Sequence, residues 1–276
     1  MILTRNVTFL LSLFFLVTTG SCFLGCSATN GPEIAKDKEF VDSLLATLTL
    51  EDKVGEMTQL TLGAIGTGLP SNLTEPQHLD SAKVHNALVK YRVGSILNCG
   101  NHSHSPEKWH EFINDIQTAA AQKPSGIPVL YGIDAIHGPT YTANGILGPQ
   151  QIGLGATWNP EAARIAGKNT AEQVHALGIH WNFSPVLDLA RDPRWPRFWE
   201  TFGEDPHLVA NMGRAIVDGY QNSGVPFAAT LKHFFGYGFS LSGKDRTPAW
   251  IPERQLREYF LPPFQAAIEA GAMSIM

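Results

Sequence analysis

The sequence contains little cysteine and no excess of positive charge, and each shortage excludes a class of protein. Three cysteines among 276 residues cannot build a disulfide framework, and no two of them have the spacing of metal ligands. The formal net charge of −5 gives the chain no general attraction for nucleic acid or for anionic lipid. We therefore expect no metal site and no nucleic-acid partner.

The N-terminus lacks a hydrophobic run long enough to span a membrane, but it has the layout of a secretory signal peptide. Arg5 is the only charged residue before Glu33, residues 7–17 are almost all apolar, and small residues follow. A membrane span needs about 20 apolar residues, so cleavage is favoured over a retained anchor. We expect residues 1–25 to be a signal peptide, no stable membrane span, and a secreted, lysosomal or other endomembrane-lumen location, or a periplasmic one in a bacterium.

Three glycosylation sequons lie beyond the expected signal peptide. Asn72 and Asn101 each open one in a polar stretch, where a eukaryotic host would use it. Asn182 opens the third inside an apolar run, where we expect a buried strand and no glycan.

What the chain does contain is a regular alternation of helix starts and apolar runs. Ser105, Asn159 and Asp205 each precede a proline and a helical pattern, the usual chemistry of a helix N-terminus. A later helical pattern is kinked at Pro262–Pro263. The short apolar runs between helices are expected to be buried strands. They span residues 54–62, 95–97, 128–133, 179–189, 227–234 and 272–276.

This alternation predicts an α/β protein with a parallel sheet covered by helices. No glycine-rich phosphate loop is present, so a TIM-type (β/α)8 barrel is favoured over a dinucleotide-binding fold. About six βα units can be counted, whereas a barrel has eight, and the chain ends at Met276 within an expected strand. We expect an incomplete barrel and the front portion of a larger protein.

Two of the expected strands end in charged or polar side chains whose burial would cost free energy if they were unpaired. Asp134 and His137 follow the third strand, and Lys232 with His233 ends the fifth. A charge beside an apolar run must be paired or bound to a polar ligand. For Asp134 the alternative is a cap on the next turn, and for His137 a structural role. Lys232 and His233 could grip hydroxyls together, or Lys232 could form a Schiff base as in barrel aldolases.

The segment after the fourth strand, residues 188–205, contains three arginines, five carboxylates and two tryptophans. Charged groups bond well to hydroxyls and tryptophan covers apolar faces, a combination that suits a sugar. The alternative is a structural network of ion pairs, which we expect for Arg191 and Asp192.

Five motifs follow one another along the chain. They are Leu48-Thr49-Leu50-Glu51-Asp52-Lys53-Val54-Gly55, Gly132-Ile133-Asp134 with His137-Gly138, Ile152-Gly153-Leu154-Gly155-Ala156-Thr157, Asp192-Pro193-Arg194-Trp195 with Arg197, and Lys232-His233-Phe234. With them the chain resembles the N-terminal domain of glycoside hydrolase family 3, in its β-glucosidase and exo-β-glucanase branch, over residues 35–276.

The resemblance implies retaining hydrolysis, which uses a nucleophilic carboxylate and an acid/base carboxyl about 5 Å apart. In the family the nucleophile lies in a Ser/Thr-Asp-Trp motif on a later strand, and the acid/base Glu comes from a second domain. No Asp-Trp pair occurs here. We therefore expect no catalytic residue in this chain and no activity from the chain alone. Glu200 and Glu204 receive no catalytic role.

The resemblance also implies that Asp134, Arg197, Lys232 and His233 bind hydroxyls of the non-reducing sugar, without a metal or organic cofactor. The expected partner is a β-linked glucoside or oligosaccharide. The expected function is hydrolysis of terminal non-reducing β-D-glucosyl residues in glucan catabolism, with this chain supplying the sugar-binding half of the site.

The alternatives are a β-xylosidase or β-N-acetylhexosaminidase of the same family, and a non-catalytic carbohydrate-binding remnant. The hexosaminidase branch carries an Asp-x-His dyad after its Lys-His-Phe motif. No histidine follows His233, which disfavours that branch.

Overall fold

The computed structural model describes residues 32–68, 72–73 and 75–276. The predicted signal peptide, residues 1–25, lies outside the described residues. The chain divides into two compact units, one ending at Thr47 and the other spanning Leu48–Met276. In the first unit the described residues form helix α1 (Pro32–Thr47). Over the described ranges, no helix combines the length and the hydrophobicity needed to cross a bilayer.

The second unit is built on a parallel sheet whose strands pair in chain order, β1-β2-β3-β4-β5-β6, among the described residues. In register, Ile96 of β2 lies opposite both Leu60 of β1 and Tyr131 of β3. Pairing of each strand with the next is the order found in a (β/α)8 barrel. The strands are β1 (Gln59–Thr61), β2 (Ser95–Leu97), β3 (Leu130–Ile133), β4 (Trp181–Asn182), β5 (Ala228–Leu231) and β6 (Ser274–Ile275). The predicted fold class is confirmed: six strands of an incomplete TIM-type barrel.

Two strand boundaries were wrong at sequence level, each for a local reason. Val54 lies in helix α2 (Leu50–Glu56), not in the first strand, because Thr49 and Asp52 form a capping box that starts a helix there. In the run 179–189 the regular strand is Trp181–Asn182. The ladder is interrupted near Pro185, which has no backbone N–H to donate, and resumes at Val186 as an isolated parallel bridge to Lys232.

The three helices predicted from Pro-containing starts are confirmed. Ser105, Asn159 and Asp205 accept hydrogen bonds from backbone N–H groups of α5, α7 and α8, respectively. Gly178 and Gly224 follow the last two of these helices with φ of 84° and 94°, the left-handed conformation that glycine favours after a helix. The bounds are α5 (Pro106–Ala120), α7 (Pro160–His175) and α8 (Pro206–Gln221).

Shorter helices complete the unit. The predicted kink near Pro262–Pro263 takes the form of a π-helical turn, η5, that runs directly into α10. The elements are α3 (Leu62–Ile65), α4 (Ser81–Val84), the π-helical η1 (His85–Lys90), α6 (Gln151–Ala156), the 3-10 turns η2 (Phe198–Glu200), η3 (Tyr237–Phe239) and η4 (Leu241–Gly243), α9 (Glu253–Gln255), η5 (Leu256–Phe260) and α10 (Leu261–Glu269).

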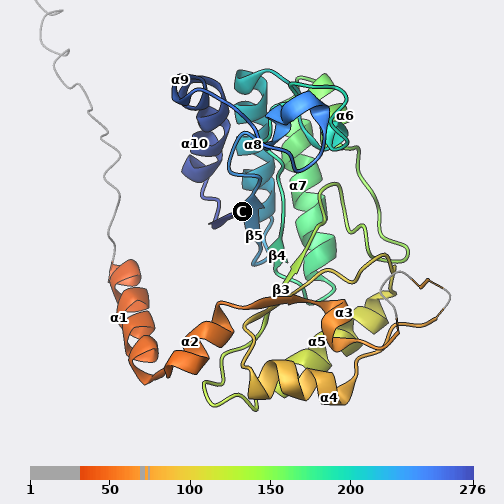
Figure 1. Ribbon diagram of the computed structural model, residues 1–276, viewed down its shortest axis with the longest axis vertical. Coiled ribbons are helices and arrows are strands. Elements are labelled where there is room, and N and C mark those ends of the chain that lie inside the picture. Colours follow the sequence, from red (N-terminus) through yellow and green to blue (C-terminus); the bar gives the residue numbers. More distant parts are fainter. Residues whose placement is uncertain (1–31, 69–71, 74) are drawn as a thin grey trace, which may run out of the picture. The chain divides into compact units, whose positions relative to one another are not determined.

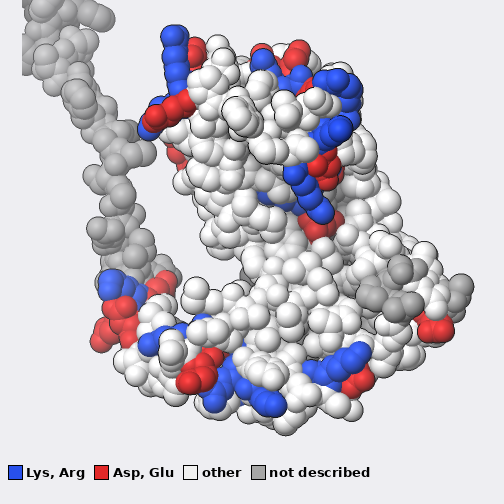
Figure 2. Space-filling model, viewed as in Figure 1, with Lys and Arg blue, Asp and Glu red and all other residues white. Residues whose placement is uncertain are grey.

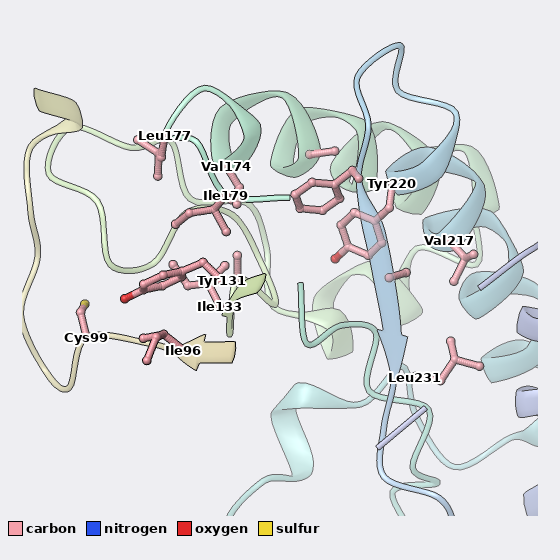
Figure 3. Packing of buried hydrophobic residues seen from close by; sticks show 14 of the residues in the cluster. Ile96, Cys99, Tyr131, Ile133, Val174, Leu177, Ile179, Val217, Tyr220 and Leu231 are labelled. Atoms are coloured by element: carbon pink, nitrogen blue, oxygen red, sulfur yellow. The ribbon is translucent and has the colours of Figure 1, made fainter. Parts of the chain in front are cut away.

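The core lies between the sheet and its covering helices. Helix α8 packs beside both α7 and α10 (Figure 1). The predicted apolar stripe of α5 is buried through Trp109, Phe112 and Ile116. Figure 3 shows side chains of the same buried cluster from strand residue Ile96 to strand residue Leu231. This packing holds the strands rigidly and so fixes the positions of the residues that follow them.

Asn182 is fully buried, as expected for the third sequon, while Asn101 is exposed. Basic and acidic side chains are interspersed on the face shown in Figure 2, without a broad field of one sign. That distribution agrees with the near-neutral charge of the chain.

Candidate functional site

The candidate site lies at the carboxyl ends of the strands, the edge at which barrel enzymes place their polar side chains. Asn98 follows β2, Asp134 follows β3, and Lys232 and His233 follow β5. Arg197 belongs to the long segment after β4. The residues therefore reach a common edge from the ends of three strands, β2, β3 and β5, and from the segment after β4.

Asp134 is held from both sides. Its Oδ1 atom lies 2.5 Å from Lys232 Nζ, and its Oδ2 accepts a hydrogen bond of 2.7 Å from Asn98 Nδ2. The backbone N–H of Asp134 donates in turn to Asn98 Oδ1 at 2.8 Å. The alternative of a simple turn cap is therefore wrong for the Asp134 side chain, which is bound to groups on two other strand ends.

Lys232 is a buried cation. Its side chain is 2% exposed, whereas that of Asp134 is 30% exposed. Burial lowers the pKa of Lys232, and the negative charge and hydrogen bond of Asp134 oppose that shift. The pair thus places a fixed charged donor beside a carboxylate that solvent or a ligand can reach.

Arg197 is fixed by two arginine–carboxylate bonds. Its Nε and Nη2 atoms donate to Glu200 at 2.7 and 2.6 Å, the bidentate geometry that suits a guanidinium. Burial disfavours the charged form of Arg197, but the bonds and charge of Glu200 outweigh burial and raise its pKa above the ordinary value. The remaining Nη1 lies 3.0 Å from His233 Nε2.

His233 is bonded on its other side to Asp188. The Nδ1 atom lies 2.7 Å from Asp188 Oδ2, and the backbone N–H of His233 donates to the same oxygen at 3.1 Å. The ring of Tyr237 meets the His233 ring edge-on, with centroids 4.9 Å apart. Lys232 and His233, although adjacent in the chain, thus both reach the site; the peptide bond between them is cis.

The four residues predicted to bind sugar are brought together in one polar cluster. Asp134 pairs with Lys232 and Arg197 with His233, and the pKa of Lys232 responds to the charges of Asp134, Arg197 and Glu200. Their role toward a sugar stays a prediction. Charge-assisted donors and acceptors in a fixed array are nevertheless what recognition of several hydroxyl groups requires.

Other predicted contacts lie elsewhere. His137 has a structural role, because its two ring nitrogens contact Gly148 O and Gln150 Nε2, each at 3.0 Å. Trp195 is 1% exposed and packs against Tyr237, so it cannot cover a sugar face as predicted. Trp199 is half exposed.

The segment after β4 also contains an ion pair between two of its own residues, which stabilises the loop. Asp192 has the structural ion pair that was expected, and its partner is Arg194 at 2.7 Å. Glu204 is exposed. Within the described ranges, no group of three or more His, Cys, Asp and Glu side chains is arranged to hold a metal ion.

Sequence reasoning missed three contributors to the cluster. Asn98 directly follows an apolar strand, as Asp134 does, and that position was the available signal. Glu200 stands three residues after Arg197 on a short helical turn, a spacing that favours an ion pair. For Asp188 no local signal links it to His233, which lies 45 residues later.

Residues 49–276 match the family described as the glycosyl hydrolase family 3 N terminal domain. The chain is 40% identical over 256 residues to a lysosomal beta glucosidase of Dictyostelium discoideum, an alignment that covers 86% of this chain and 30% of that protein. It is also 39% identical over 172 residues to a beta-xylosidase of Formosa agariphila, covering 58% of this chain and 24% of the other.

Among solved structures, an exo-1,3/1,4-beta-glucanase from a Pseudoalteromonas species matches with a TM-score of 0.75 and 32% sequence identity. That match covers 89% of this chain and 30% of the other. The chain thus spans less than a third of the length of these relatives. Because the family's N-terminal domain accounts for residues 49–276, the chain belongs to glycosyl hydrolase family 3.

Proposed function

We propose that this chain supplies the part of a retaining β-glucosidase site that binds the terminal non-reducing β-D-glucosyl residue of a β-glucoside or β-glucan. The observation that carries the proposal is the cluster of Asp134, Arg197, Lys232 and His233 at the carboxyl edge of the sheet. The names of the relatives, a beta glucosidase and an exo-beta-glucanase, support glucose as the sugar.

The physical basis is that a sugar hydroxyl both donates and accepts. Asp134 offers carboxylate lone pairs to a hydroxyl proton, while Lys232 and Arg197 offer N–H groups to a hydroxyl oxygen. The ion pairs with Asp134 and Glu200 keep these two cations in place before a sugar arrives. A preformed array of this kind loses little side-chain freedom when it binds.

The carboxylates nearest this cluster are each engaged by a cationic or imidazole group. Asp134 binds Lys232, Asp188 binds His233 and Glu200 binds Arg197. None of the three is free to attack an anomeric carbon or to protonate a leaving oxygen. We therefore propose that none of the three is the nucleophile or the acid/base group of the whole protein.

Binding of monosaccharides to the folded chain, measured by isothermal titration calorimetry, tests the proposal. Glucose is expected to bind, and Asp134→Asn is expected to weaken it by about 10-fold, because one charged acceptor is lost. Asp192→Asn is the control, since it also removes a paired carboxylate. Asp192 pairs with Arg194 in the segment after β4 and belongs to no part of the proposed sugar-binding cluster. A folded chain that binds no glucose, or that binds equally well after either substitution, contradicts the proposal.

Xylose in the same experiment addresses the second candidate, a β-xylosidase, which the Formosa agariphila relative favours. Xylose is glucose without the hydroxymethyl group on C5, so it discriminates between sites that do and do not contact that group. Tighter binding of xylose than of glucose would transfer the proposal to a β-xylosidase. N-acetylglucosamine provides the corresponding comparison for the hexosaminidase alternative.

For location, we propose a lysosomal, other lumenal or secreted compartment. The proposal rests on the signal-peptide layout of residues 1–25 and on the lysosomal relative. N-terminal sequencing of the mature protein is expected to begin between about Gly20 and Ala28. Mature protein that begins at Met1 would contradict it.

A further inference from the structure

We infer that Asp188 is a positioning residue that holds His233 as the neutral Nδ1–H tautomer, so that His233 Nε2 accepts a hydrogen bond from Arg197. The inference rests on the proposed function, because His233 and Arg197 are the side chains proposed to touch the sugar. It assigns to Asp188 a part in choosing which imidazole nitrogen carries the proton, and the contact of His233 with Arg197 favours the same choice.

The first line of evidence is the environment of Asp188. Its side chain is fully buried, and its carboxylate is an acceptor toward three N–H groups. Oδ2 faces His233 Nδ1 at 2.7 Å and the His233 backbone N–H at 3.1 Å, while Oδ1 accepts from the Gly238 backbone N–H at 3.3 Å. The carboxylate therefore binds the segment that follows β5 at two points, His233 and Gly238, and it fixes the plane of the imidazole.

The second line of evidence comes from the opposite side of the ring. Arg197 Nη1 lies 3.0 Å from His233 Nε2. A guanidinium has five N–H donors and no acceptor, so this contact requires a lone pair on Nε2. The proton of the neutral ring must then be on Nδ1, where Asp188 accepts it. The two contacts assign the same tautomer independently.

The result is a continuous chain of hydrogen bonds across the site. It runs from Asp188 through His233 and Arg197 to Glu200. Glu200 holds one edge of the Arg197 guanidinium through two hydrogen bonds. His233 Nε2 accepts a hydrogen bond from the remaining nitrogen, Nη1. A side-chain amide in place of the Asp188 carboxylate can donate to Nδ1, which favours the Nε2–H tautomer. An Nε2–H would face the Arg197 N–H group, and two donors repel each other. Arg197 would then leave His233.

Nitrogen-15 NMR of the histidine rings in the folded chain tests the inference directly. His233→Gln identifies the His233 signals by their loss. In the wild-type chain His233 is expected to show a protonated Nδ1 and an unprotonated Nε2. In Asp188→Asn the two nitrogens are expected to exchange roles, or to become an equal mixture. The control is Asp52→Asn, which alters another buried carboxylate, bonded to Thr49 at the start of α2, and should leave the His233 signals unchanged.

A protonated Nε2 in the wild-type chain overturns the inference, and that spectrum needs no variant to fold. An unchanged His233 pattern in folded Asp188→Asn overturns it as well. Glucose binding provides a second readout, in which Asp188→Asn is expected to be about 10-fold weaker while Asp52→Asn is not. A wild-type chain that shows the expected tautomer but binds no glucose supports the inference and contradicts only the proposed function.

Discussion

Lys232 Nζ lies 2.5 Å from Asp134 Oδ1, although the two residues are 98 positions apart in the chain. The pair joins the ends of β3 and β5, the strands on either side of β4, and only the lysine is fully enclosed. A buried ammonium beside a partly exposed carboxylate leaves one oxygen side of Asp134 accessible while it neutralises the other. This asymmetry is what makes the pair a binding element rather than an ordinary core ion pair.

Lys232→Met is expected to weaken glucose binding by at least about 10-fold, because a charge-assisted bond to a hydroxyl is worth about 1.5–3 kcal/mol. Calorimetric titration of the folded variant provides the measurement. Lys123→Met is the matched control, since the Lys123 side chain is likewise buried and pairs with Glu56 at 2.7 Å. Both variants are expected to lose stability, and only the first to lose affinity. Equal affinities would assign Lys232 a structural role.

Arg197→Lys is expected to reduce glucose affinity by about 10-fold, because an ammonium cannot bond to both Glu200 oxygens and to His233 at once. Arg194→Lys in the same loop is the control, because the Arg194 side chain is 70% exposed and pairs with Asp192. Titrations of the two variants are compared side by side. An Arg197→Lys chain with wild-type affinity would show that the guanidinium only stabilises its loop.

Helix α6 offers a matched test of packing behind the site. A Cβ added at Gly155 would lie 1.9 Å from the backbone oxygen of Phe202, whereas one added at Gly153 would meet nothing closer than 3.6 Å. Gly155→Ala is therefore expected to lower the free energy of unfolding by about 1–3 kcal/mol or more. Gly153→Ala is expected to raise it by about 0.5–1 kcal/mol. Denaturant unfolding distinguishes them, and a Gly155→Ala chain of wild-type stability would contradict the close approach.

The stability of the chain is expected to fall as the pH drops from about 6.5 to about 4, partly because of His104. Burial lowers the pKa of His104 to about 4, and the neighbouring His102 and Lys108 add to the shift. Its ring contacts Gln77 Oε1 through Nε2 at 2.9 Å. Between its folded pKa and its ordinary value near 6.5, the unfolded chain binds the extra proton, so protonation favours unfolding.

This histidine contributes a loss of about 2–3 kcal/mol over that interval, which levels off below about pH 4. Denaturant unfolding at several pH values measures it, and His104→Gln is expected to flatten the profile relative to the wild type. His207→Gln, at an exposed position on α8, should leave the profile unchanged. Identical profiles for all three chains would refute the assignment.

The 276-residue chain is expected to release no nitrophenol from an aryl β-glucoside. The three carboxylates of the cluster are occupied by Lys232, His233 and Arg197, so the described site offers no pair of free carboxyl groups for retaining hydrolysis. The assay is run with purified chain beside a full-length family member. Turnover by the wild-type chain that disappears in Glu200→Gln would contradict this prediction and would identify Glu200 as a catalytic residue.

The fold could be predicted because its signals are local. Each of three helices begins directly after a capping residue, Ser105, Asn159 or Asp205. The apolar runs alternate with those helices. Strand length was harder, because it depends on competition between neighbouring signals. The capping box of Thr49 and Asp52 turned residues expected in a strand into α2.

The site could be predicted in part for the same reason. Asp134 and Lys232 stand directly after apolar strands, where an unpaired charge is costly, so each drew attention by itself. Trp195 was placed wrongly because composition cannot tell a buried ring from an exposed one. The bond between Asp188 and His233 depends on how two long segments meet, and no spacing in the sequence encodes that meeting.

The division of the cluster among several strand ends has a consequence for how a ligand would act on the molecule. A sugar held by Asp134, Arg197 and His233 would tie together segments that begin after β3, β4 and β5. Ligand that binds only the folded state adds free energy to every opening that disrupts its site. Amide protons of these strands should therefore gain protection from solvent exchange together, so that the bound sugar behaves as a removable cross-link of the sheet.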